Sequence, residues 1–527
     1  MRAAVVAKIA LGLLLLAGGS LHAEDWQMYG RDPQHSFSNP DSRINPGNVA
    51  KLQSRDALAW TFQTGDAVSA SPTVVGGVVY VGSWDGYFYA LDAKLGKLNW
   101  KYRVACQYTV LPIPKHCLPP GFPPPSRTKT DGGIITSSAA VVDISTAGGI
   151  KRIVYFGAGK TLYALNADSG MLLWKRVICG KPNVLDFACA FDFLDPTRIF
   201  SSPAVLGDLV FVGHTVDGVN GYSGGFEAID AVTGKIRWRF ELDPGGNNRG
   251  CGSVWSSAAI DETALPPLVF FGTGDCHEDA TPPYHEAVIA LEAASGKLRW
   301  VYRPRNADTC DFDFGASPNI IDFGNGHFLG IGGKDGRYYL LNRLTQNPAG
   351  ELVWKTKKVV FGGFDGGFFG GAAFDGQHLY SATGIGDGSP FTLTGLCRPS
   401  NPRDTFLQDP SMHALNVDPS IPADHRILWE QSENHSFGAT SLGGANSLGH
   451  RVVFSGLVGP VPTLGLFVPS GLNAFDTDGK LLATPVTLLP MPGSVNSAAT
   501  PVGDMLFVTS GNTFDGKGGV VRAFKLP

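Results

Sequence analysis

Three aspartates, a lysine and a tryptophan stand in loop-like segments where their side chains could act together. Asp311 and Asp313 form an Asp-x-Asp phrase, Asp275 follows Gly-Thr-Gly, and Lys334 begins Lys-Asp-Gly. Two carboxylates about 4 Å apart repel by roughly 4 kcal/mol at an effective dielectric constant of about 20, so a cluster of them binds protons or a metal ion. Hard oxygen ligands suit Ca²⁺, and a broad indole such as that of Trp255 suits a planar redox molecule.

Each of these phrases also has an ordinary structural interpretation. An Asp-x-Asp before a strand is often a turn or a cap, and Lys-Asp-Gly is typical of a hairpin turn. Trp255 taken alone could pack between neighbouring elements. The chemical interpretation therefore depends on whether the fold brings these loops to one place.

A repeated phrase that ends in tryptophan indicates which elements position these loops. Its clearest form, Leu-Asp-Ala-Lys-Leu-Gly-Lys-Leu-Asn-Trp, has near-copies along most of the chain. An internal repeat of this size means one supersecondary unit stacked many times. We interpret its tryptophans as packing between units, not as a ligand cage. They are Trp60, Trp100, Trp174, Trp238, Trp300, Trp354 and Trp429.

Each repeat unit contains four short apolar segments separated by glycine-rich turns, as in residues 71–75, 78–82, 87–91 and 97–102. Four antiparallel strands joined in this way form a meander, and radial packing of such sheets is a β-propeller. The sequence predicts an all-β, eight-bladed propeller of four-stranded antiparallel blades. The first strands begin at Ser71, Ser137, Ser201, Ser256, Ser317, Gly371, Thr440 and Ser497.

The two ends of the chain are expected to complete the eighth blade together. No tryptophan-containing strand follows residues 520–524, and residues 58–62 near the N-terminus form a single strand of that type that belongs to no other blade. Closing the ring in this way hides edges that would otherwise be exposed. The seventh copy of the phrase lacks its tryptophan, so one repeat is degenerate.

The propeller topology gives a reason for the chemical residues to converge. In every blade the loop before the first strand and the loop between the second and third strands open on the same face. Loops of this kind in blades four and five contain the five residues named at the outset, and blade three adds His214 and Asp217. We therefore expect them to surround the mouth of the central channel.

The repeat A-x-D-x-x-[ST]-G-K-x-x-W resembles that of the pyrroloquinoline quinone (PQQ) dehydrogenases, the eight-bladed quinoprotein alcohol and sugar dehydrogenases. Trp26-Gln-Met-Tyr-Gly30 and the segment Ile44 to Leu52 look most like the polyvinyl alcohol dehydrogenase branch. The likeness covers residues 25–527. Relatives of this propeller also serve as non-enzymatic scaffolds.

The resemblance implies a base and a metal site. Asp311 matches the family's catalytic aspartate, the general base, although Cys310 replaces the tryptophan before it. Asp275 stands where the family has a calcium-binding asparagine, and Asp217 is an approximate counterpart of a calcium-binding glutamate. Asp313 occupies the place of an extra acid that suits a lanthanide in some relatives.

The resemblance also implies a quinone site. Trp255 matches the tryptophan floor beneath the quinone, and Lys334 matches a quinone-contacting lysine or arginine. Arg127 is a weak candidate for the quinone-binding arginine. The adjacent cysteine pair that covers the quinone in many alcohol dehydrogenases is missing, although Cys106 and Cys117 lie in the corresponding region.

These roles imply oxidation of a small or polymeric alcohol with PQQ and Ca²⁺, or a lanthanide. The ion polarises the quinone carbonyl, and the base takes the alcohol proton as hydride leaves the carbinol carbon. The chain has no Cys-x-x-Cys-His motif, so no covalent haem is expected. Electrons would then pass to an external acceptor such as a cytochrome c.

Composition and the first residues bound the remaining properties. A net charge of −4 gives no sign of nucleic-acid binding. Residues 1–23 have the positive start, short apolar run and small terminal residue of a signal peptide, with an uncleaved anchor as the alternative. We expect residues 24–527 to form one propeller domain, exported to the periplasm or outside the cell, without a transmembrane segment in the mature chain.

Eight cysteines in an exported chain suggest disulfides. Cys106 with Cys117, and Cys179 with Cys189, are close enough in sequence to staple local loops. The spacing gives no pairing for Cys251, Cys276, Cys310 and Cys397.

Two functions fit the sequence. The first is a PQQ-dependent alcohol dehydrogenase with Asp311 as its base. The alternative is a non-catalytic propeller that acts as a binding or assembly scaffold. The missing cysteine pair and arginine favour the scaffold, whereas the acidic loops and Trp255 favour the enzyme.

Overall fold

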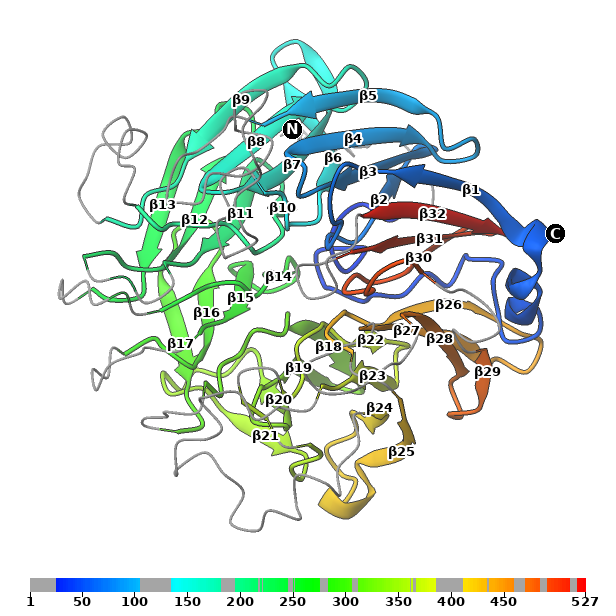
Figure 1. Cartoon of the computed structure of the whole chain (residues 1–527). Helices are drawn as coiled ribbons and strands as arrows, with labels where there is room; N and C mark the ends of the chain where they lie inside the picture. The colour runs from blue at the N-terminus through cyan, green and yellow to red at the C-terminus, as the bar shows by residue number, and fades with distance from the viewer. Residues whose placement is uncertain are drawn as a thin grey trace, which may run out of the picture.

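Eight four-stranded antiparallel sheets form the blades of a ring (Figure 1). The computed structural model describes residues 25–104, 134–181, 195–216, 219, 221–244, 250, 252–274, 283–305, 311–360, 362–363, 366–384, 411–433, 436–458, 470–483, 491–511 and 519–527. The predicted all-β, eight-bladed propeller is confirmed. Asp217, Asp275, Arg127 and the predicted signal peptide lie outside the described residues.

The first four blades follow the chain in order, each sheet consisting of four consecutive strands. Blade one contains β2 (Thr73–Val75), β3 (Val78–Gly82), β4 (Tyr87–Asp92) and β5 (Leu98–Arg103). Blade two contains β6 (Ala140–Thr146), β7 (Gly149–Ala158), β8 (Thr161–Asn166) and β9 (Leu172–Val177). Blade three contains β10 (Ala204–Leu206), β11 (Leu209–His214), β12 (Gly225–Asp230) and β13 (Ile236–Glu241). Blade four contains β14 (Ala259–Asp261), β15 (Leu268–Gly272), β16 (Val288–Glu292) and β17 (Leu298–Tyr302).

The remaining blades continue the pattern. Blade five contains β18 (Asn319–Phe323), β19 (Gly326–Gly332), β20 (Tyr338–Asn342) and β21 (Leu352–Lys355). Blade six contains β22 (Ala373–Phe374), β23 (His378–Ala382), β24 (Ser411–Asn416) and β25 (Ile427–Ser432). Blade seven contains β26 (Ser441–Ala445), β27 (Arg451–Leu457), β28 (Gly471–Asp476) and β29 (Leu481–Ala483). Blade eight contains β30 (Thr500–Val502), β31 (Met505–Ser510), β32 (Val520–Lys525) and β1 (Leu58–Gln63).

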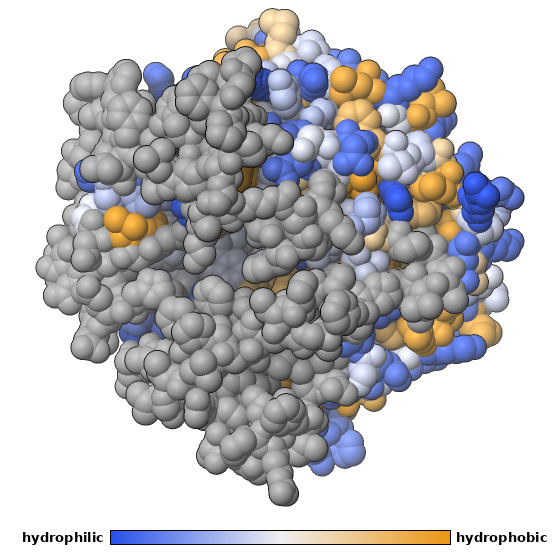
Figure 2. Space-filling model, in the orientation of Figure 1, coloured by the Kyte–Doolittle hydropathy of each residue, from blue (hydrophilic) through white to orange (hydrophobic). Residues whose placement is uncertain are grey.

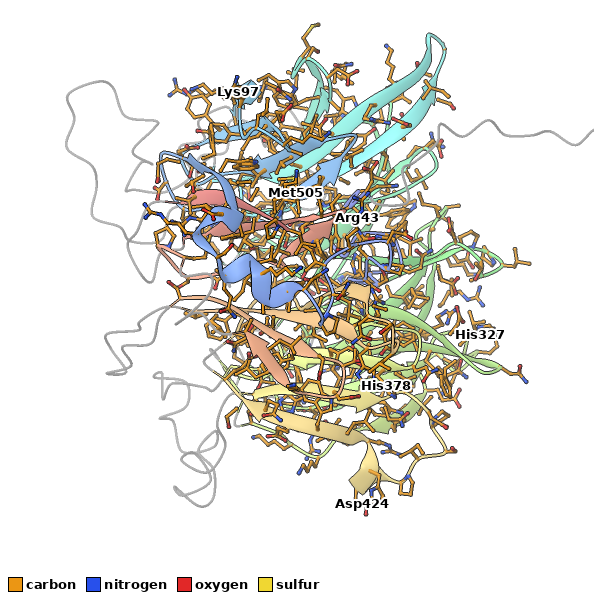
Figure 3. The ribbon with its side chains drawn as sticks, turned by 90° about the vertical axis from the view of Figure 1, so that its right-hand side faces the viewer. Arg43, Lys97, His327, His378, Asp424 and Met505 are labelled. Carbon is orange, nitrogen blue, oxygen red and sulfur yellow. The ribbon has the colours of Figure 1, made fainter. Side chains whose placement is uncertain are left out.

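The eighth blade closes the ring with strands from both ends of the chain, as predicted. β1 pairs with β32 in antiparallel register, with Phe62 opposite Val521. Figure 1 shows this junction as a blue strand beside a red one. The outer turns of the blades form the rim: Lys97 in blade one and Asp424 in blade six lie on opposite sides of the ring (Figure 3).

The repeated tryptophans pack between blades, as the sequence indicated. The Trp100 indole donates a hydrogen bond to the Ala167 carbonyl in the next blade (2.9 Å). Gly170 of that blade has φ +70°, and a Cβ there would lie 2.6 Å from the Trp100 ring. The glycine of the repeated phrase is therefore required both by its backbone and by the tryptophan of the preceding blade. The same pairing joins Trp60 to Gly96, Trp174 to Gly234, Trp238 to Gly296 and Trp429 to Gly479.

The missing tryptophan of blade seven has a structural explanation. Blade eight takes its outer strand from the N-terminus, so it has no turn between third and fourth strands for a tryptophan to meet. The short 3₁₀-helix η1 (Val49–Gln53) contacts β29 at this position instead. Its Val49 and Leu52 are buried in one apolar cluster with Ala483. The motif Ile44 to Leu52 thus fills the space at the degenerate blade.

The other short helices are η2 (Arg55–Ala57) and η5 (Ala423–His425). None of the helices in the described part of the chain has the length and apolar character needed to cross a bilayer. Figure 2 shows hydrophilic and hydrophobic side chains interspersed on the right-hand part of the ring.

Two buried tryptophans allow a matched test of the inter-blade hydrogen bond. Trp300 donates to the Arg343 carbonyl (3.1 Å), whereas the buried Trp354 Nε1 has no hydrogen-bond partner among the described residues. Both rings are almost fully buried, at 1% and 2% exposure. We expect Trp354→Phe to cost about 1 kcal/mol less in unfolding free energy than Trp300→Phe, because only the latter breaks a hydrogen bond and leaves a carbonyl unpaired. Urea unfolding of the two variants measures the difference, and an equal or larger loss for Trp354→Phe would contradict it.

Candidate functional site

The loop before β18 presents two buried or nearly buried carboxylates. Asp311 has φ +59°, in the left-handed region that side chains other than glycine rarely adopt, with aspartate among the better tolerated. Asp313 lies two residues later, and its carbonyl accepts a hydrogen bond from the Lys334 amide (3.0 Å). This backbone bond joins the aspartate loop to the turn between β19 and β20.

Lys334 lies between the two carboxylates. Its Nζ is 2.7 Å from Asp311 Oδ2 and 3.3 Å from Asp313 Oδ1. The lysine side chain is 5% exposed, and those of Asp311 and Asp313 are 11% and 4% exposed. Buried charges persist in proteins when they are paired. These three groups together carry an excess of one negative charge, which favours a further cation.

Trp255 joins the same cluster. Its indole N–H donates to Asp313 Oδ2 (3.2 Å), and Lys334 Nζ lies 5.8 Å from the centroid of its ring. The ring is half-buried. An ammonium at this distance from an indole is attracted to its π system. The structure therefore brings together Trp255, Asp311, Asp313 and Lys334. The positions of their loops in the blades had led us to expect all four at the mouth of the central channel.

Two glycines let the backbone approach this cluster closely. A Cβ on Gly315 would lie 1.6 Å from the Trp255 ring, and one on Gly362 would lie 1.6 Å from the Lys334 carbonyl oxygen. No side chain fits at either position without moving the site.

Two phenylalanines extend the site, and the residue types singled out from the sequence did not include them. Phe369 precedes β22, and its ring centroid lies 5.9 Å from that of Trp255 and 5.6 Å from Lys334 Nζ. Phe437 precedes β26 and packs edge-on against Phe369 (4.9 Å). Both precede the first strand of a blade. The expectation that such loops converge would therefore have included them if it had been applied to apolar residues.

His214 does not contribute to the mouth of the channel as expected. It is buried in blade three, with Nδ1 3.2 Å from Glu227 Oε2 and Nε2 3.1 Å from the Ser223 carbonyl oxygen. Arg239 Nε is 3.0 Å from Glu227 Oε1. Despite its burial, Glu227 has a lowered pKa because His214 and Arg239 favour its ionised form. This buried group holds β11, β12 and β13 together.

Asp217, Asp275 and Arg127 lie outside the described residues, so their roles stay predictions. No group of three or more histidine, cysteine, aspartate or glutamate side chains arranged to hold a metal occurs among the residues that the structure describes. Asp311 and Asp313 are the two predicted ligands within that part.

Of the cysteines, the described part of the chain contains Cys179. It is disulfide-bonded, and its partner lies outside the described residues. Its pairing with Cys189 stays a prediction, as does that of Cys106 with Cys117. Cys251, Cys276, Cys310 and Cys397 also lie outside the described residues.

The residues present fit a planar anionic quinone and a metal ion. The half-buried Trp255 ring offers a flat surface, and Gly315 gives the ring room that a Cβ would fill. Lys334 supplies a positive charge beside that ring, and the two carboxylates exceed the charge of the one ammonium between them. Oxygen donors of this type suit Ca²⁺.

Glu433 gives a prediction of pH dependence in the loop before blade seven. Its carboxylate accepts hydrogen bonds from Ser455 Oγ (2.8 Å) and Asn473 Nδ2 (2.9 Å), yet burial raises its pKa from 4.5 to about 7. Between these two values this carboxyl binds more protons in the folded protein than in the unfolded chain, so its own contribution to stability falls as pH rises through this range, by up to about 1.4 kcal/mol per pH unit. We expect Glu433→Gln to remove this contribution, so that the unfolding free energy of the wild type minus that of the variant falls as pH rises. Urea unfolding of both proteins from pH 4.5 to 7.5 checks it, and a difference that does not change with pH would contradict the assignment.

The chain is similar to known proteins over most of the propeller. Residues 26–359 match the PQQ family described as glucose/ethanol/alcohol dehydrogenase, β-propeller domain. The chain is 26% identical to a quinate/shikimate dehydrogenase (quinone) of Acinetobacter baylyi, over 64% of this chain and 45% of that protein. It is 25% identical to a polyvinylalcohol dehydrogenase of Pseudomonas sp., over 69% of this chain and 55% of that protein. The matched region thus spans about half the length of these relatives.

Solved structures show the same fold. A europium-containing methanol dehydrogenase superposes with a TM-score of 0.66 at 16% identity, covering 96% of this chain and 98% of that one. A quinohemoprotein alcohol dehydrogenase from Comamonas testosteroni also gives 0.66, at 19% identity, covering 95% of this chain and 80% of that one.

Proposed function

This chain belongs to the PQQ-dependent glucose, ethanol and alcohol dehydrogenase β-propeller family, and on that premise we propose that it oxidises an alcohol with PQQ and a bound metal ion. Asp311 is the general base of the proposed reaction. The observation that carries the proposal is the convergence of Asp311, Asp313 and Trp255 on one buried ammonium, that of Lys334.

Each of these side chains has a distinct task in the proposed reaction. Asp311 accepts the alcohol proton on a carboxylate oxygen. Lys334 lies 2.7 Å from that carboxylate and favours its ionised, proton-accepting form. Trp255 supports the planar cofactor, and Asp313 fixes the indole by accepting a hydrogen bond from its N–H. When bound, PQQ with its cation supplies the hydride acceptor and the Lewis acid.

The metal site is proposed to include Asp311 and Asp313 together with Asp275 and Asp217. Ca²⁺ suits oxygen ligands of this kind, and the number of carboxylates also suits a trivalent lanthanide. Arg127 is the proposed additional quinone ligand.

The remaining proposals concern the setting of the reaction. Residues 1–23 have the pattern of a signal peptide, which supports export to the periplasm or the medium. A cytochrome c or a similar external acceptor would take the electrons, because the sequence contains no Cys-x-x-Cys-His.

Dye-linked turnover tests the proposal. The purified chain is incubated with PQQ and either Ca²⁺ or La³⁺, and dye reduction is followed with primary and secondary alcohols, glycerol, glucose, quinate and polyvinyl alcohol. We expect metal- and PQQ-dependent reduction with at least one alcohol, and its loss on chelation. A protein that neither binds PQQ nor reduces the dye would contradict the enzyme and favour the scaffold.

A further inference from the structure

One arginine outside the cluster of Trp255, Asp311, Asp313 and Lys334 contacts both the loop that carries Asp311 and the turn that carries Lys334. Arg305 follows β17, and its Nη2 donates a hydrogen bond to the Phe312 carbonyl. Its Nη1 lies 3.1 Å from Asp335 Oδ2, and its Nε lies 3.7 Å from Glu286 Oε2. One guanidinium therefore links blade four to two loops of blade five.

The contacted residues are direct chain neighbours of the reacting groups. Phe312 stands between Asp311 and Asp313, and Asp335 follows Lys334. Arg305 thus contacts one residue in each of the two loops that carry Asp311 and Lys334, whose side-chain charges lie 2.7 Å apart. A planar guanidinium has several donors in fixed directions, so it can hold both segments at once.

Other contacts surround this link. The Arg305 guanidinium lies 5.3 Å from the Phe312 ring, which also has Lys358 Nζ at 5.3 Å. Asp335 accepts a hydrogen bond from the Tyr339 hydroxyl (2.5 Å). Arg305 is only 20% exposed, so its position is largely fixed by these neighbours.

The backbone of Asp311 explains why such a link is needed. Its φ of +59° is a conformation that costs on the order of 1–3 kcal/mol and persists only when the surroundings hold it. A displacement of about 1 Å in a reacting group can lower a rate by about 100-fold. We infer that Arg305 is a positioning residue, which holds the Asp311 segment against the Lys334 turn; its effect on turnover rests on the proposed function.

Variants of Arg305 test this inference with two independent measurements. Arg305→Met removes the hydrogen-bond donors and keeps much of the side-chain length. Arg305→Lys keeps the positive charge but not the planar guanidinium with its several donors. Arg299→Ala is the matched control, because Arg299 on β17 contacts Glu292 (3.6 Å) and neither loop of the site. Turnover is measured with saturating PQQ and metal, and hydrogen exchange is measured at the Lys334 amide, which donates to the Asp313 carbonyl.

We expect kcat to fall by about 100-fold in Arg305→Met and by about tenfold in Arg305→Lys, with affinity for PQQ changed by less than about threefold. Exchange at the Lys334 amide should rise in both variants and stay unchanged in Arg299→Ala. Wild-type exchange at that amide in Arg305→Met would overturn the inference whether or not the protein is an enzyme. An active wild type with an equally active Arg305→Met would overturn it too, whereas an inactive wild type with raised exchange in the variants would count against the proposed function alone.

Discussion

Replacing Asp311 with asparagine is expected to lower kcat by a factor of about 10² to 10⁴, the range that a positioned general base contributes. Asparagine has nearly the same shape but no charge with which to accept the alcohol proton. It also tolerates the left-handed backbone at this position, where φ is +59°. The fold and the affinity for PQQ should therefore be retained, and dye-linked kinetics with a PQQ titration measure both.

The control for this variant is Asp208→Asn, which changes an aspartate that is 65% exposed at the turn between β10 and β11. Its turnover should equal that of the wild type. If Asp311→Asn retained wild-type turnover while binding PQQ normally, Asp311 would not be the base.

Removing the ammonium between the carboxylates is expected to have the largest effect on stability. In Lys334→Met, Asp311 and Asp313 lose the cation that lies 2.7 and 3.3 Å from them. Loss of one partner of a buried ion pair costs about 3–5 kcal/mol, because the remaining charge stays buried. We expect the free energy of unfolding to fall by this amount in metal-free buffer, as measured with urea.

Excess Ca²⁺ should restore part of that loss, because a ligand that binds only the folded state stabilises it. Lys97→Met, at an exposed turn residue of blade one, should leave stability unchanged with or without Ca²⁺. A Lys334→Met protein as stable as the wild type would show that the three charges do not form the close group described above.

Much of the fold could be predicted because its determinants are local and repeated. The phrase ending in tryptophan recurs with a glycine whose position is set by the tryptophan of the preceding blade, as Gly170 is by Trp100. The orphan strand around Trp60 had one place left in an eight-bladed ring, and it occupies that place beside β32.

The site could be predicted in part, because loop position in a propeller determines which residues converge. It predicted that Asp311, Lys334 and Trp255 lie close together, and in the structure Lys334 contacts both of the other two. The expectation was wrong for His214, because a position in a loop does not determine the direction of a side chain. His214 lies in blade three, where it contacts Glu227.

Other parts of the site were not predicted from the sequence. Arg305 belongs to no repeat and no motif, and its contacts with Phe312 and Asp335 depend on how the connection between β17 and β18 folds against blade five. Phe369 and Phe437 were not predicted, although both precede first strands, because apolar residues in a propeller usually pack between blades. Their contact with each other joins loops that are 68 residues apart, and Phe369 also lies near Lys334.

The retention of PQQ by the protein tests most directly whether a quinone binds on Trp255. The chain is incubated with PQQ and Ca²⁺, passed through a gel-filtration column, and its absorbance spectrum is recorded, alongside Trp255→Ala and Trp84→Ala. Trp84 is also half-buried, but its indole donates to Ser69 in blade one. We predict that the wild type and Trp84→Ala retain the quinone in the presence of Ca²⁺ and that Trp255→Ala loses it. Equal retention by Trp255→Ala, or none by the wild type, would contradict a quinone site on Trp255 beside Lys334 and Asp311.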